Sequence, residues 1–119
     1  MPYVIEHVVK DFYKLVCVCE NGMGTIIGDL PILPWCFKCR DELKVGNVRV
    51  CWSDELSVKV KNYEGKLRVK GAYVNGELRS VMFILYNIPC NVDATALFDE
   101  VTSIVNKLCV KKEGQYHLK

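Results

Sequence analysis

The sequence has none of the long apolar runs that a membrane-spanning helix needs. Its longest run, residues 81–86, is far shorter than the roughly 20 residues that cross a bilayer, so we expect no transmembrane helix. The first residues also lack the basic region and the continuous apolar region of a secretory signal. These absences predict an intracellular protein, cytoplasmic or nuclear, with no membrane partner.

Histidine and serine are scarce, and neither occurs in a familiar catalytic motif. The two histidines, His7 and His117, are too far apart in sequence to form a zinc hydrolase motif. None of the four serines lies in a Gly-x-Ser-x-Gly turn, and Gly22-Met23-Gly24 lacks both the third glycine of a dinucleotide-binding loop and the lysine of a P-loop. The sequence therefore favours a protein that is not an enzyme.

The composition is that of one folded domain. Half of the 119 residues are hydrophobic and a quarter are charged, and a chain of this length has room for a single core, so we expect one domain over residues 1–119. Sixteen basic and fourteen acidic side chains give a net charge of +2. This charge is too small to predict an anionic partner unless the charges are unevenly placed.

The first half of the chain is patterned as short strands. The apolar residues of 3–19 fit one face of a helix as well as a strand, and the β-branched content favours two extended segments separated near Lys10-Asp11. The segment 21–24 predicts a turn. Pro31 and Pro34 predict an irregular, extended stretch over 28–36. The strands expected in this half cover about residues 3–9, 12–19, 25–27 and 48–52.

The second half is patterned as hairpins. Residues 57–61 and 66–70 alternate strictly between apolar side chains and polar or basic ones, with a turn expected at 62–65. Asn75-Gly76 is a preferred two-residue hairpin turn, and it leads into a strand over about 78–88. That strand is apolar on both faces, which predicts a central position in the sheet or a helix covering it.

A helix is expected at the end of the chain, and its position completes the fold class. Asn91 or Asp93 can cap it, and its apolar residues follow helical spacing at Leu97, Val101, Ile104, Val105 and Leu108. Residues 110–119 have no periodicity and are expected to be mobile. Together the patterns predict an α+β fold: a mainly antiparallel sheet, with a β-meander in its C-terminal half, and one amphipathic C-terminal helix packed on it.

Seven cysteines are unusual for an intracellular chain, where metal binding or redox chemistry is the usual explanation. Four of them form a Cys-x-Cys and a Cys-x-x-Cys pair, at Cys17, Cys19, Cys36 and Cys39. Four thiolates from two short clusters can surround one structural zinc ion. Buried thiols and an incidental disulfide are the alternatives, because free cysteine is itself often buried; core packing is expected for Cys51, Cys90 and Cys109.

The segment Trp35-Cys36-Phe37-Lys38-Cys39-Arg40 resembles the Trp-Cys-x-x-Cys active site of the thioredoxin family. The resemblance implies a thiol–disulfide oxidoreductase in which Cys36 is the nucleophile and Cys39 the resolving cysteine. In that family the motif begins a long helix between parallel strands. Here Gly46-Asn47 follows within about two helical turns, so the resemblance covers only these few residues.

Basic side chains are concentrated on the expected hairpin. Residues 57–79 contain six basic and two acidic side chains, while the rest of the chain has a net charge of −2. Such a face can contact nucleic-acid phosphates, with a tyrosine available for base stacking. The alternatives are that these lysines only keep an exposed strand soluble, or that they meet an acidic protein. The candidate nucleic-acid-binding residues are Lys59, Lys61, Tyr63, Lys66, Arg68 and Lys70.

Three functional hypotheses follow from these patterns. The first is a small non-enzymatic binding module, stabilised by zinc, that presents the basic hairpin to nucleic acid. The second is the oxidoreductase that uses Cys36 and Cys39. The third is a protein-interaction or oligomeric accessory protein that makes contact through an exposed edge strand or the outer helix face.

Overall fold

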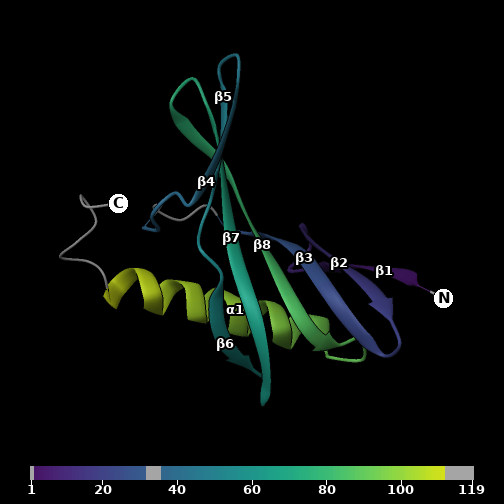
Figure 1. Ribbon diagram of the computed structural model, residues 1–119. Coiled ribbons are helices and arrows are strands. Elements are labelled where there is room, and N and C mark those ends of the chain that lie inside the picture. Colours follow the sequence, from purple (N-terminus) through teal and green to yellow (C-terminus); the bar gives the residue numbers. More distant parts are fainter. Residues whose placement is uncertain (1, 32–35, 112–119) are drawn as a thin grey trace.

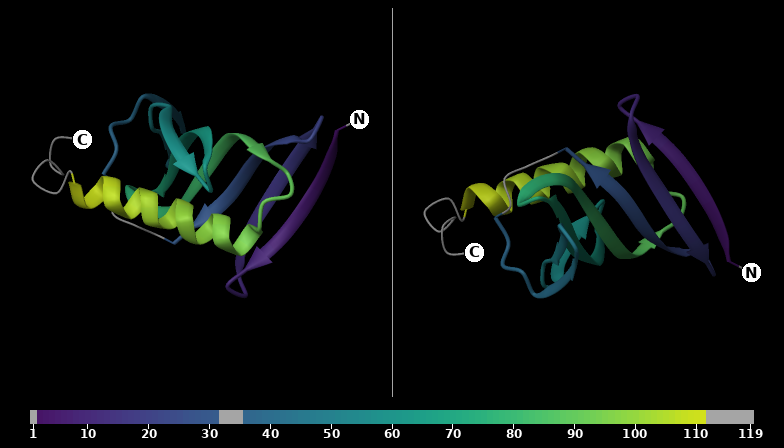
Figure 2. Two further views of the ribbon diagram at one scale, coloured as in Figure 1. Left: turned by 90° about the horizontal axis from the view of Figure 1, so that it is seen from below. Right: turned by 90° about the horizontal axis from the view of Figure 1, so that it is seen from above.

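The computed structural model describes residues 2–31 and 36–111, and it confirms the predicted fold class. One antiparallel sheet of eight strands carries one C-terminal helix on one of its faces (Figures 1 and 2). The strands are β1 (Tyr3–Val9), β2 (Tyr13–Glu20), β3 (Met23–Leu30), β4 (Asp41–Val45), β5 (Val48–Trp52), β6 (Leu56–Val60), β7 (Tyr63–Val74) and β8 (Glu77–Pro89), and the helix is α1 (Ala94–Lys111).

The sheet order is β1-β2-β3-β8-β7-β5-β4, with β6 also paired to β7. The long strand β7 has two partners on one edge: residues 63–67 pair with β6, and residues 70–74 pair with β5. Ser53 lies in the segment that connects β5 to β6, the two partners of β7. Its backbone N–H donates to the Val69 carbonyl over 2.8 Å, and its hydroxyl oxygen accepts from the Val69 N–H over 2.9 Å, so hydrogen bonding to β7 continues across the junction.

Four hairpin turns consist of two residues with positive φ, which lets the turn follow the twist of its strands. The predicted break at Lys10-Asp11 and the predicted turn at Asn75-Gly76 are confirmed. The turn predicted at 62–65 is wrong, because Lys61 and Asn62 form it and β7 already begins at Tyr63. The other such turn is Asn21-Gly22.

The core lies between the sheet and α1. The predicted central position of β8 is confirmed, since β8 pairs with β3 on one side and with β7 on the other. Inward side chains of these strands are fully buried against apolar residues of the helix. Asp93 caps α1, as predicted, because its carboxylate accepts from the Ala96 N–H over 3.1 Å. The core includes Leu67, Val69, Phe83, Leu85, Leu97, Val101 and Val105.

The hairpin β4–β5 and the adjoining ends of β7 and β8 extend beyond the helix (Figure 1). β4 was not predicted, because its residues are all exposed and carry no strong periodic pattern. The irregular stretch predicted over 28–36 is wrong for its first part: β3 continues to Leu30, since it pairs with β2 and β8 at once. Residues 32–35 and 112–119, where the rest of that stretch and most of the predicted mobile tail fall, lie outside the described residues.

Candidate functional site

Six of the seven cysteines form three disulfides, which join Cys19 to Cys90, Cys36 to Cys109 and Cys39 to Cys51. The four predicted zinc ligands are therefore not brought together. Cys36 is bonded to the end of α1, and Cys39 is bonded to β5. For the same reason Cys36 and Cys39 do not form the redox pair that the thioredoxin-like motif implies.

Three sulfur atoms nevertheless form a cluster near the start of the helix. The Sγ atoms of Cys17, Cys19 and Cys90 all lie within 4.8 Å of one another, and those of Cys17 and Cys19 are 3.3 Å apart. Gly24 makes the space, because a Cβ atom there would lie 3.0 Å from the sulfur atoms of both Cys17 and Cys90. Cys17 is not in a disulfide, and burial raises the pKa of its thiol.

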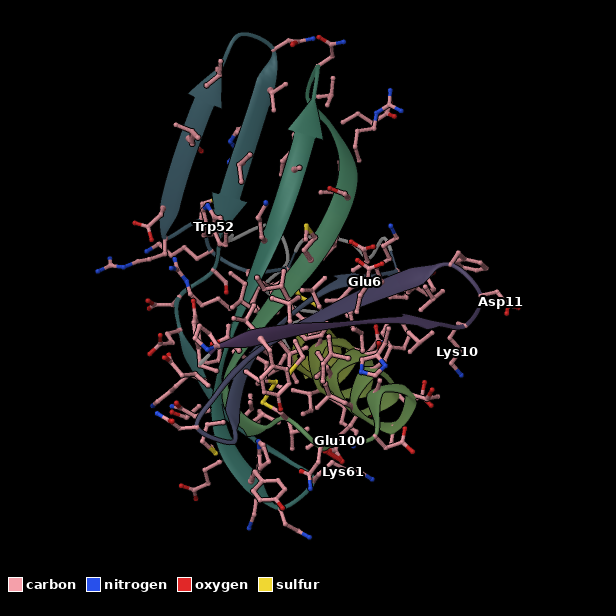
Figure 3. The ribbon with its side chains drawn as sticks, turned by 90° about the vertical axis from the view of Figure 1, so that its right-hand side faces the viewer. Glu6, Lys10, Asp11, Trp52, Lys61 and Glu100 are labelled. Atoms are coloured by element: carbon pink, nitrogen blue, oxygen red, sulfur yellow. A yellow bond between two sulfur atoms is a disulfide. The ribbon has the colours of Figure 1, made fainter. Side chains whose placement is uncertain are left out.

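The predicted basic residues divide between two faces of the sheet. Strand alternation places Lys66, Arg68 and Lys70 on the face turned away from α1, which we call the outer face, and Lys59 lies there as well. Lys61 lies in the turn, where its backbone N–H donates to the Glu100 carboxylate over 2.5 Å (Figure 3). Tyr63 faces the helix side, as does its strand partner Val60. Four of the six predicted residues therefore share one surface.

Two aromatic residues that the sequence prediction missed lie beside this basic row. Trp52 is the strand partner of Lys70, and the Lys70 ammonium nitrogen lies 5.1 Å from the centre of its ring. The guanidinium carbon of Arg68 lies 5.4 Å from the same ring. Tyr86 is the partner of Lys66 on β8. Their alternation with buried neighbours along β5 and β8 is the sequence signal that would have placed both residues on this face.

Part of the basic row is already neutralised within the chain. Arg68 donates to the Asp41 carboxylate over 2.7 Å and to the Ser53 carbonyl over 3.1 Å. The ammonium group of Lys66 donates to the hydroxyl of Ser57 over 2.7 Å. The hydroxyl is neutral, so only the charge of Arg68 is compensated, and the row presents one free positive charge fewer than its sequence suggests.

The centre of the outer face is apolar. In the described part of the chain, the helix α1 covers only the opposite face of the sheet (Figure 2). The outward side chains of β2, β3 and β8 are therefore half-buried or exposed. Further out, Val4 and Val8 on β1 are 62% and 58% exposed. An apolar patch of this kind on a folded protein usually marks a contact surface. Its central members are Val16, Val18, Thr25, Ile27, Met82, Ile84 and Tyr86.

Charges of opposite sign flank this apolar centre. On the β1 to β3 side the outer face carries three acidic residues and Lys14, for a net charge of −2. On the β6 and β7 side it carries four basic residues and Glu64, together with the Asp41 carboxylate that pairs with Arg68, for a net charge of +2. One of the acidic residues is Glu6, which lies on β1 (Figure 3). The acidic residues are Glu6, Glu20 and Asp29, and the basic residues are Lys59, Lys66, Arg68 and Lys70.

Comparison of the chain with protein-family models, curated proteins and solved structures finds no match. In the described part of the chain, no helix is long and apolar enough to cross a bilayer. Functional inference therefore depends on the sulfur cluster and the outer face.

Proposed function

We propose that the protein is a non-enzymatic interaction module whose outer face binds the outer face of a second copy. This develops the third sequence hypothesis and moves the contact from an edge strand or the helix to the sheet. The observation that carries the proposal is the charge pattern: an apolar centre with a net charge of −2 on one side and +2 on the other.

A two-fold axis parallel to the strands, near the boundary of β3 and β8, makes this surface complementary to itself. The axis turns one sheet over onto the other, so β1 to β3 of one copy face β6 and β7 of its partner. Acidic side chains then meet basic ones on both sides of an apolar centre. The molecule measures 40 × 32 × 27 Å, so one face can supply the roughly 800 Å² that each partner buries in a stable interface.

Affinity in such a dimer comes mainly from the apolar centre, and the flanking charges mainly select the orientation. Burying a whole isoleucine side chain is worth about 1.5–3 kcal/mol. Ile84 is already mostly buried in the single chain, so each copy gains at most about a third of that amount. Because a dimer contains two copies, losing Ile84 removes at most about 1–2 kcal/mol, which raises the dissociation constant by up to about thirtyfold.

The test is sedimentation equilibrium on two matched variants. Ile84→Lys places a charge at the apolar centre and is expected to give a monomer with an unchanged circular dichroism spectrum. Phe12→Lys is the control, because Phe12 is 70% exposed in the β1–β2 turn, away from this centre, and its variant is expected to remain dimeric. A wild-type protein that is monomeric at every concentration, or an Ile84→Lys variant that dimerises like the wild type, would reject the proposal.

Single-stranded nucleic acid is a second candidate ligand of the outer face. Lys66, Arg68 and Lys70 project at alternate positions of one strand, about 7 Å apart, with Trp52 and Tyr86 beside them for base stacking. A fluorescence anisotropy titration of a labelled single strand at several salt concentrations tests it. We expect Lys66→Glu with Lys70→Glu to abolish salt-sensitive binding, and Lys44→Glu on β4 to leave it unchanged. Equal binding by both variants would reject this face.

The predicted intracellular location and the predicted structural zinc remain proposals. Disulfides are typical of oxidising compartments, and three in one small domain would suit such a location equally well. A thiol count on protein isolated under alkylating conditions decides between the two locations. Seven free thiols would support the reducing interior of a cell, and one would support an oxidising compartment.

A further inference from the structure

The cluster of Cys17, Cys19 and Cys90 has the composition of a metal site. Its sulfur atoms come from β2 and from the residue after β8, which are far apart in sequence. They lie on the buried side of the sheet, above a glycine whose missing side chain leaves them room. An ordinary disulfide needs two cysteines, so the position of the third calls for an explanation.

We propose that Cys17, Cys19 and Cys90 hold one zinc ion when the Cys19–Cys90 disulfide is reduced, with His7 as the fourth ligand. This site keeps two of the residues that the sequence pattern suggested. It replaces Cys36 and Cys39 by Cys90 and a histidine. The proposal is independent of the binding partner of the outer face.

The distances between the sulfur atoms suit zinc. Zinc binds thiolates at about 2.3 Å, which places the sulfur atoms of a tetrahedral site about 3.8 Å apart. The sulfur atoms of Cys17 and Cys19 are 3.3 Å apart, those of Cys17 and Cys90 are no more than 4.8 Å apart, and those of Cys19 and Cys90 are bonded to each other. Adjustments of a few tenths of an ångström to about one ångström suffice for the two distances to Cys17, and reduction of the disulfide lets the Cys19 and Cys90 sulfur atoms move apart to the same spacing.

His7 lies beside the cluster, and its ring must turn toward the sulfur atoms to complete the site, because the ligand atoms within 4.8 Å of one another are those of the three cysteines. It lies on β1 opposite Leu15, one strand position diagonal to Cys17, and its side chain is half-buried on the helix-facing side. His7, Cys17 and Cys90 line one cavity of about 10 Å³. That volume accommodates about one water molecule, which is also the space that a single ion requires. The other residues of the cavity wall are Leu15, Ile26, Val92, Ala94 and Leu97.

The disulfide and the zinc site exclude each other, because both use the sulfur atoms of Cys19 and Cys90. The conversion of one into the other balances in protons and electrons. A small dithiol reductant gives two electrons and two protons to the Cys19–Cys90 bond and becomes a cyclic disulfide. The protein then has thiols at Cys17, Cys19 and Cys90. Binding of Zn²⁺ displaces three protons as the thiolates form and changes no oxidation state.

The first measurement is zinc content by elemental mass spectrometry, after gel filtration in a dithiol reductant. We expect about one zinc per chain in the wild type and in Cys36→Ser, and none in Cys17→Ser or Cys90→Ser. The pair Cys36→Ser and Cys90→Ser separates this site from the set suggested by sequence, because each residue belongs to only one of the two sets. Circular dichroism reports whether each variant folds.

A second measurement needs no variant. Alkylation of the reduced, zinc-loaded wild type, followed by mass spectrometry, should find Cys17, Cys19 and Cys90 protected and the other four cysteines labelled. Removing zinc with a chelator should abolish that protection. Absence of zinc from the reduced wild type, or protection of Cys36 and Cys39 in place of Cys90, would overturn the proposal.

Discussion

The disulfide between Cys36 and Cys109 should stabilise the protein more than the one between Cys39 and Cys51. The reason is the length of chain that each bond closes in the unfolded state: the sequence separations are 73 and 12 residues. The entropy lost by the unfolded chain grows with the logarithm of that length. It corresponds to about 4.4 kcal/mol for the long loop and about 2.8 kcal/mol for the short one at 25 °C.

The assay is urea unfolding of two double variants, Cys36→Ala with Cys109→Ala and Cys39→Ala with Cys51→Ala. Each is measured beside the wild type with and without a thiol reductant. In the oxidised state we expect the first variant to lose about 1.6 kcal/mol more cross-link stabilisation than the second. The differences measured in reductant give the packing cost of the alanines, since no cross-link is present there, and are subtracted. Equal losses after this correction, or a wild type whose stability does not respond to reductant, would refute the reasoning.

Three further predictions concern single residues. Ser53→Ala should lower the free energy of unfolding by about 1–3 kcal/mol in urea titrations, because it leaves the buried Val69 N–H without its acceptor; Ser57→Ala is the exposed control. Gly28→Ala should lower the free energy of unfolding by about 1–3 kcal/mol in the same assay, because its Cβ would clash with the buried side chains of Leu15 and Phe83. An unchanged stability would show that the core accommodates the extra methyl group without cost. With its disulfides intact, the native protein should contain one free thiol, that of Cys17. An alkylating agent should label it more slowly than a free cysteine at the same pH, because burial raises the pKa of the thiol and leaves less thiolate. Rapid labelling would contradict the burial of Cys17.

Local patterns predicted most of the secondary structure. Alternation placed the strands of the β6–β7 hairpin, helical spacing placed α1 from its cap at Asp93, and Asn75-Gly76 placed the final hairpin turn. Glycine is typical of turns, and the turn predicted at 62–65 fails at Gly65. It lies inside β7, where a Cβ would be 2.8 Å from the Tyr86 carbonyl oxygen. That contact joins neighbouring strands, so no local pattern contains it.

The candidate sites depend still more on contacts between distant parts of the chain. Cys17 and Cys19 are neighbours in the sequence pattern, but Cys90 joins them only because β8 ends beside the β2–β3 turn. There the backbone N–H of Cys90 donates to the Gly22 carbonyl over 3.2 Å. The basic side of the outer face was visible as an alternating hairpin. Its acidic side was not, because β1 to β3 become neighbours of that hairpin only through the sheet order.

An outer face that is complementary to itself should produce a dimer, which the molar mass in solution reveals. Light scattering on the wild-type protein over a wide concentration range should give twice the 13.6 kDa mass of the chain at high concentration. Dilution should return the mass to that of one chain. A mass of 13.6 kDa at every concentration would contradict the claim.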